Sequence, residues 1–137
     1  MTAFEYLNRA RVLNRQIKLD HQELAILRET SISAQFGSCS GAAEGTSEGG
    51  TPRSKVESAA IRIVSFENRI VEKMRELEKI KREITETISK LSDPVERIIL
   101  TWRYVLLKPW SDVIDKTGYS RRQVFRVHKK AMRNVGI

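Results

Sequence analysis

The chain has 137 residues, a formal net charge of +8 and an isoelectric point of about 9.9. That length allows one domain, or one small domain with an extension. A strongly basic chain favours an acidic partner such as nucleic acid. The single cysteine, Cys39, excludes an internal disulfide and a zinc site built on a cysteine pair.

The first residues lack the basic start and apolar run of a signal peptide. No apolar stretch reaches the roughly 18 residues of a membrane helix. We therefore expect a soluble, cytoplasmic protein with no membrane partner.

Residues 1–35 are expected to form the first helix of a hairpin. Residues 3–30 contain no Gly or Pro and are rich in Leu, Arg, Glu and Gln, which favours a helix. Residues three and four apart form one stripe: Leu7, Ala10, Asn14, Ile17, His21 and Leu24. Asn14 and His21 interrupt that stripe. An Asn at such a position commonly fixes register or partner number, and we interpret His21 as a polar seam residue rather than a ligand.

Residues 36–54 are mostly small and polar and predict a flexible link, because they cannot bury enough apolar surface to offset the entropy of ordering. Their glycines do not end in Gly-Lys-Ser/Thr and follow no strand, which argues against a phosphate-binding loop.

Residues 55–91 have the clearest periodicity in the chain. Six apolar residues fall seven apart: Val56, Ile63, Ile70, Leu77, Ile84 and Leu91. A second row lies half a heptad away: Ala59 or Ala60, Phe66, Met74, Ile80 and Ile88. This pattern predicts a coiled-coil-type helix roughly 50 Å long. Its partner is either the helix within residues 1–35, folded back antiparallel, or the same helix of a second subunit.

Residues 92–137 are expected to form a helix-turn-helix unit of three helices. Asp93 and Pro94 begin the first helix, Glu96 completes an Asp-x-x-Glu capping box, and the helix ends before Pro109. Its aromatic residues are expected to join one core with apolar residues downstream: Trp102, Tyr104, Trp110, Val113, Ile114, Val124 and Val127.

Residues 109–130 predict the helix-turn-helix itself. A short helix at 110–117 precedes Gly118, which suits a left-handed helix end, and Ser120 with Gln123 forms a capping box for the next helix. One face of that helix is apolar, with Val124, Val127 and Ala131. Residues 119–137 carry six Lys/Arg and no Asp or Glu. Phosphates explain such an unmixed charge better than helix stability does. The alternative is a helical hairpin with a basic surface.

Three stretches carry a family resemblance: the residues from Leu91 to Tyr104, Trp110-Ser-Asp-Val-Ile, and Gly118-Tyr-Ser-Arg-Arg-Gln-Val. Together they resemble sigma-70 region 4. The whole chain is similar to phage-encoded ArpU/RinA-like late-gene activators, most closely over residues 91–135. It departs from region 4 at Ile114, where a small residue is usual, and at Thr117, where an apolar one is usual.

The resemblance implies DNA-contacting residues on and beside the second helix of the motif. They are Ser120, Arg121, Arg122, Phe125, Arg126 and Lys129 toward the groove, and Lys130, Arg133 and Lys116 toward phosphates. For Arg121 and Arg122, base reading and phosphate clamping both remain open. Phe125 is expected either to contact a thymine methyl group or to pack against the long helix. His128 receives no role.

We expect an all-α protein in which a long antiparallel helical hairpin precedes a helix-turn-helix unit. The expected function is a sequence-specific DNA-binding transcriptional regulator, a phage or prophage late-gene activator acting with host RNA polymerase. A homodimer through the long helices would fit this function. The alternatives are a recognition protein like the small terminase subunits and a coiled-coil adaptor that binds polymerase or sigma factor without reading DNA. No catalytic arrangement, metal-ligand spacing or cofactor loop is evident.

Overall fold

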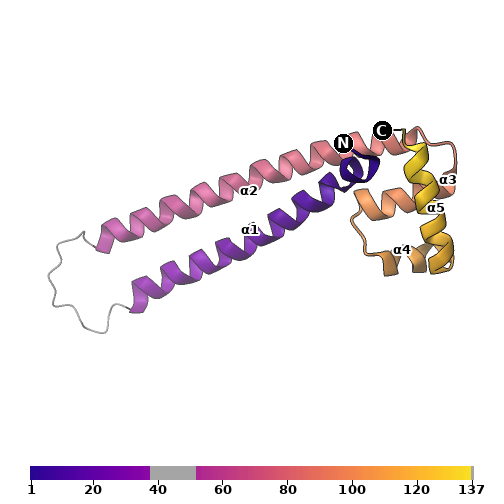
Figure 1. Ribbon diagram of the computed structural model, residues 1–137. Coiled ribbons are helices and arrows are strands. Elements are labelled where there is room, and N and C mark those ends of the chain that lie inside the picture. The colour runs from indigo at the N-terminus through magenta and orange to yellow at the C-terminus, as the bar shows by residue number, and fades with distance from the viewer. Residues whose placement is uncertain (38–51, 137) are drawn as a thin grey trace. The chain divides into compact units, whose positions relative to one another are not determined.

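The computed structural model describes residues 1–37 and 52–136, and these residues are all-α (Figure 1). In chain order the elements are α1 (Ala3–Gly37), α2 (Pro52–Ser89), α3 (Pro94–Leu100), the π-helical η1 (Thr101–Val105), α4 (Trp110–Thr117) and α5 (Arg121–Asn134). The expected class, two long helices followed by shorter ones, is confirmed. Residues 38–51, which include Cys39 and most of the predicted link, lie outside the described residues.

The chain divides into two compact units. One comprises Gln16–Met74, and the other comprises Met1–Arg15 together with Arg75–Ile137. Within the described residues, no helix combines the length and the apolar character needed to cross a bilayer.

In the unit Gln16–Met74, α1 and α2 run antiparallel. Asp20 forms an ion pair with Lys73 (Oδ2 to Nζ, 2.5 Å), and Arg28, further along α1, pairs with Glu67, earlier on α2. Their apolar faces meet through Ile17, Leu24 and Ile70, all buried as the heptad pattern predicts.

Three positions predicted to lie between these helices are exposed instead, and the first of them, Val56, retains 39% of its accessible surface. His21 is exposed, and Met74 retains 48% of its accessible surface. Their sequence neighbours Asp20 and Lys73 lie between the helices in place of His21 and Met74. On α1, the residue after Ile17 that contacts α2 is therefore three positions further on, at Asp20, rather than four positions on, at His21. The aliphatic stem of lysine covers apolar surface while its ammonium pairs with the carboxylate. The polar interruption is therefore an ion pair rather than a histidine.

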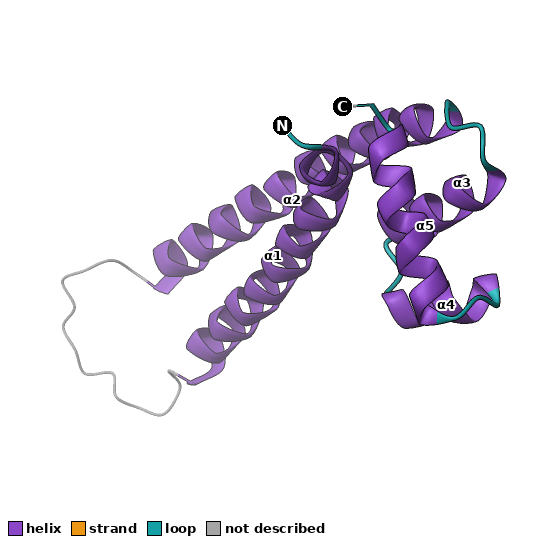
Figure 2. Ribbon diagram, turned by 45° about the vertical axis from the view of Figure 1, so that its right-hand side comes forward, coloured by secondary structure: helices purple, strands orange, loops and turns teal. Residues whose placement is uncertain are grey.

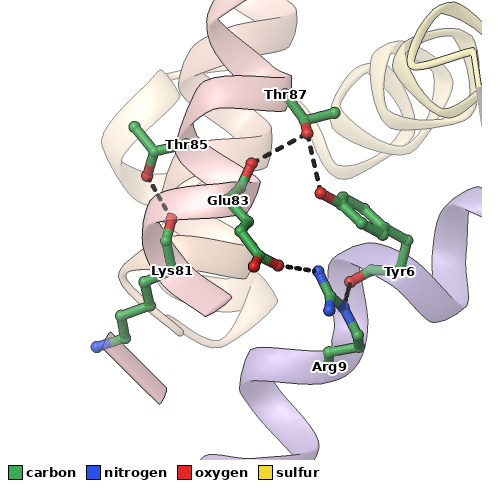
Figure 3. A network of polar contacts seen from close by, with 6 residues as sticks. All are labelled: Tyr6, Arg9, Lys81, Glu83, Thr85 and Thr87. Carbon is green, nitrogen blue, oxygen red and sulfur yellow. Dashed lines mark hydrogen bonds and ion pairs between the residues drawn. The ribbon is translucent and has the colours of Figure 1, made fainter. Parts of the chain in front are cut away.

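In the other unit, the start of α1 packs against the end of α2 through buried Leu7, Ala10, Ile84 and Ile88. Figure 3 shows the polar contacts beside this core. Arg9 Nη2 lies 3.0 Å from Glu83 Oε2, and Tyr6 Oη lies 3.2 Å from Thr87 Oγ1. Because Thr87 donates its only hydroxyl proton to the Glu83 carbonyl (3.0 Å), Tyr6 is the donor of the bond between them.

Helix α3 begins as predicted at Asp93, whose Oδ1 accepts from Val95 N at 2.9 Å, and Pro94 takes the first helical position. The predicted capping box is wrong in its second half. Glu96 does not bond back to Asp93; it is buried, with 1% of its surface exposed, and both its carboxylate oxygens accept from Asn134 Nδ2 at 3.0 and 3.1 Å. The carboxylate is directed to α5 because α5 supplies the donor inside the fold.

The helix expected to continue to Pro109 changes form after Leu100. At η1 the backbone hydrogen bonds span more residues than in an α-helix: Leu106 N donates to Thr101 O and Lys108 N donates to Trp102 O, each at 2.9 Å. Leu107 then takes a left-handed conformation, with φ of 57°. This wide turn buries Tyr104 and leaves Arg103 partly accessible.

The short helices α3, α4 and α5 lie together (Figure 2). They share one apolar cluster. Ile99, Val113 and Val124 are fully buried at its centre, each from a different helix. Packed around them are Val95, Trp102, Trp110, Ile114 and Val127. This is the core predicted from the spacing of the apolar and aromatic residues, and it fixes α5 against α3 and α4.

Candidate nucleic-acid interface

The turn between α4 and α5 has the predicted local structure. Gly118 ends α4 in the left-handed conformation (φ 73°), and its N–H donates to Ile114 O at 3.1 Å. A Cβ at this position would meet no atom within 4 Å, so the backbone angle rather than crowding favours glycine. Thr117 Oγ1 donates to Val113 O at 2.9 Å, which gives this departure from the region 4 pattern a role at the helix end.

Helix α5 starts with a complete capping box. Ser120 Oγ accepts from Gln123 N at 3.2 Å, and Gln123 Oε1 accepts from Ser120 N at 3.2 Å. The predicted box is confirmed. Its closure satisfies two backbone donors and holds the first turn of α5, where Arg121 and Arg122 begin the cationic surface.

All six basic residues of α5 are exposed: Arg121, Arg122, Arg126, Lys129, Lys130 and Arg133. None of them forms an ion pair with an acidic residue within the described part of the chain. Ser120 is exposed at the start of the same helix. The buried face of α5 consists of Val124 and Ala131, with Val127 partly buried. The helix thus presents positive charge on every face that its core contacts leave free.

Aromatic rings lie beside this cationic surface. Phe125 packs against Trp110 of α4, with ring centroids 4.8 Å apart, and keeps 36% of its surface exposed. Arg121 lies over the Phe125 ring, 5.8 Å from its centroid. Lys116, exposed on α4, lies 5.8 Å from the centre of the Trp102 ring. All nine residues expected to contact DNA are therefore at least partly accessible, on α4, α5 and the turn between them.

The sequence reasoning missed His128, which gives α5 its polar contact with η1. Its Nε2 lies 2.7 Å from the hydroxyl oxygen of buried Tyr104, and the two rings stack at 5.8 Å. Trp110 meets the imidazole edge-on at 4.9 Å. Burial, with a smaller contribution from the Arg103 charge, lowers the pKa of His128 to about 4. Burial raises the pKa of Tyr104 to about 12. Both groups are neutral near pH 7.

A family model described as "Protein of unknown function (DUF1492)" matches residues 38–136. The chain belongs to this family. No curated protein and no solved structure matches the chain.

The DUF1492 match contains α2 and every later element, whereas α1 precedes it. It therefore includes the complete apolar cluster of Ile99, Val113 and Val124 and the whole cationic surface of α5. Among the described residues, no three His, Cys, Asp or Glu side chains gather as metal ligands do.

The Tyr104–His128 pair predicts acid sensitivity. Between pH 6.5 and about 4 the unfolded chain binds a proton at His128 that the folded chain does not, so stability falls as pH is lowered through this range. If His128 were fully buried, the free energy of unfolding would fall by roughly 3 kcal/mol over this pH range. Because the imidazole keeps some contact with solvent, screening reduces this loss, and we expect about 1–2 kcal/mol. Urea unfolding at pH 7.5 and 4.5 measures the loss.

The matched control is His128→Gln, whose amide still bonds the Tyr104 hydroxyl but does not titrate. It should lose less stability than the wild type on acidification, whereas His21→Gln, at an exposed position, should behave as the wild type. Equal acid sensitivity of all three proteins would contradict the assignment to His128.

Proposed function

We propose that this chain is a sequence-specific, double-stranded DNA-binding transcriptional regulator that places α5 in the major groove. The observation that carries the proposal is the exposed cationic surface of α5, which forms no ion pair with the described acidic residues and is held on α4 through the Gly118 turn. The major groove is about 12 Å wide and admits a helix.

The charge distribution supports a nucleic-acid-binding role for α5 rather than a surface that is basic by chance. Like charges one turn apart on a helix repel by a few tenths of a kcal/mol, and opposite charges at the same spacing stabilise it. Helix α2 mixes the two signs, as in the Glu78–Lys81 pair, whereas α5 contains no acid. A phosphate backbone supplies the counter-charge that no ion pair within the described residues gives to α5.

Each exposed group has a role under this proposal. Arg121 and Arg122, in the first turn of α5, read bases or clamp phosphates, while Arg126 and Lys129 continue one and two turns along. Phe125, held by Trp110 with part of its ring exposed, contacts a thymine methyl group. Lys116, Lys130 and Arg133 contact phosphates, and Ser120 caps the helix at the DNA.

The finer assignment is a sigma-70 region 4-like regulator, a phage or prophage late-gene activator working beside host RNA polymerase. It is supported by the motif residues and by the three-helix arrangement they form, in which α3 with η1 precedes α4 and α5. Under this assignment the long helices contact polymerase or a second protomer while α5 holds the promoter.

A homodimer is supported by a second set of apolar residues on the long helices. Besides the residues buried between α1 and α2, exposed residues recur seven apart: Val12, Leu19 and Ile26 on α1, and Val64 and Val71 on α2. A heptad row that faces solvent is typical of a helix pair that packs against another helix. A dimer would read two half-sites about one helical turn, or a multiple of it, apart.

The proposal is tested with purified protein and genomic duplexes from the gene cluster that encodes it, compared with unrelated duplexes of equal length. Wild-type protein should bind one site selectively, and footprinting should show one protected segment or two half-sites. Arg121→Ala with Arg126→Ala should weaken binding to the site by about ten- to a hundred-fold and reduce its selectivity. Arg62→Ala with Arg69→Ala, at exposed positions on α2, is the charge-matched control.

Weak binding that is indifferent to sequence and to these arginines would overturn the proposal. Retained binding to polymerase or sigma factor after reversal of Arg121, Arg122 and Arg126 would then favour the adaptor. A ring of many subunits in solution would favour the terminase-like alternative.

A further inference from the structure

A second group of arginines lies outside the cationic surface of α5. Arg11 and Arg15 are one turn apart on α1, and Arg103 lies on η1; all three belong to the same compact unit. None of the three forms an ion pair with an acidic residue in the parts of the chain that the structure describes.

Arg11 is unusual because part of its guanidinium is buried without a partner. Its Nε and Nη1 are inaccessible to solvent, yet neither has a hydrogen-bond partner among the described residues. A buried donor left unsatisfied is destabilising, and a charged one more so. Burial and then the charge of Arg15 lower the pKa of Arg11, and burial and then Arg11 lower that of Arg103. The charges that act on Arg11 and Arg103 at pH 7 are those of the other arginines, because the nearby Tyr104 and His128 are neutral.

Arg103 is held in place by its neighbours. Its guanidinium carbon lies 4.6 Å from the centre of the Trp110 ring, and its Nη1 donates to the Lys108 carbonyl at 3.2 Å. Among the described residues, no partner takes the remaining guanidinium donors of Arg103, which can therefore bind a ligand. A planar guanidinium offers paired N–H groups that match the oxygens of phosphate.

A continuous series of contacts links this group to α5. Arg121 lies over Phe125, Phe125 packs on Trp110, and Arg103 stacks on Trp110. Arg103 therefore lies where the aromatic contacts of the cationic surface end. The charge of Arg11 acts on Arg103, and Arg15 lies one turn further along α1, so the positive charge continues onto that helix. Phosphates flank the groove that a recognition helix occupies, so a cationic group beside that helix is placed for the backbone.

We propose that Arg11, Arg15 and Arg103 form a binding site for a phosphate of the DNA backbone, which extends the DNA contact from α5 onto the first helix of the chain. The inference deepens the proposed function and rests on it. It assigns α1, which the DUF1492 match does not include, a direct part in DNA binding.

The test compares wild type with Arg11→Gln/Arg15→Gln, which leaves the Arg103–Trp110 contact in place. DNA affinity is titrated against salt on the selected site and on unrelated duplex. The double variant should bind both duplexes about tenfold more weakly, and the slope of log affinity against log salt should fall by about 1–2. Arg62→Gln with Arg69→Gln, exposed residues on α2, is the control of equal charge and should change the slope less.

A thermal unfolding arm separates a binding role from a structural one. Removing two unpaired cations should leave the melting temperature unchanged or raise it, whereas a structural role predicts a lower one. Inorganic phosphate, compared with chloride at equal ionic strength, should raise the melting temperature of the wild type and not that of the double variant.

The outcomes keep the two proposals apart. If the wild type binds its site and the double variant keeps the same affinity and slope, the phosphate site is overturned and the proposed function stands. Phosphate stabilisation without a change in DNA binding assigns the arginines to a free anion and overturns the backbone contact. If the wild type binds no DNA, both proposals fall.

Discussion

Replacing Tyr104 with alanine should destabilise the unit that carries α5 by about 3–5 kcal/mol. Tyr104 is 1% exposed and connects η1 to α5 through its hydroxyl bond to His128 (2.7 Å) and its ring contact. Truncation removes a whole ring from the core and leaves the imidazole without that partner. Since small domains are stable by only about 5–15 kcal/mol, the loss removes a large part of the total.

Urea unfolding followed by tryptophan fluorescence measures this directly, because both tryptophans, Trp102 and Trp110, lie in the same unit as Tyr104. Tyr104→Phe is the graded control. It keeps the ring and removes only the hydroxyl, so it should cost about 1–3 kcal/mol. An unfolding midpoint for Tyr104→Ala equal to that of the wild type would show that the pair does not hold α5 to η1.

The local features of the helix-turn-helix were predictable because each depends on residues close together in sequence. Gly118 and the Ser120–Gln123 capping box act over three or four positions, and both have the expected geometry. The apolar core was predictable for a related reason. Helical periodicity alone places Val113 and Val124 on the inward faces of their respective helices.

The contacts that sequence reasoning missed join residues far apart in the chain. Tyr104 and His128 are 24 residues apart, and Glu96 and Asn134 are 38 apart. The neighbouring sequence does not indicate these distant partners: Glu96 fits a capping box with Asp93, and nothing around His128 gives it a role. Only the packing of α5 against α3 and η1 decides between the local partner and the distant one.

A similar limit explains the change at η1 and the shift between the long helices. Nothing in the residues from Thr101 to Val105 departs from α-helical preference strongly enough to predict wider backbone bonds. On α1, the step that places Asp20 rather than His21 beside α2 is a choice between spacings of three and four. Both spacings are compatible with a helical stripe. The spacing of three is favoured because it brings Asp20 to Lys73 on α2.

Replacing Asn134 with leucine should destabilise the same unit by about 2–3 kcal/mol, although Asn134 itself is an exposed residue. The cost arises at its partner. Glu96 is 1% exposed, and both carboxylate oxygens accept from Asn134 Nδ2, so the substitution removes that donor from a buried carboxylate. Chemical unfolding of the single variant measures the loss.

The second substitution decides whether this explanation is right. With leucine at position 134, Glu96→Met removes the carboxylate, and replacing both members of a buried polar pair by apolar groups is often nearly neutral. The double variant should therefore recover most of the stability lost by Asn134→Leu alone, with a coupling free energy of about 1–3 kcal/mol. Strictly additive losses would mean that the two residues act independently. A large coupling would instead show that this pair fixes the end of α5 to the start of α3. The contact that holds the end of α5 would then come from Asn134 and not from the basic residues on its exposed faces.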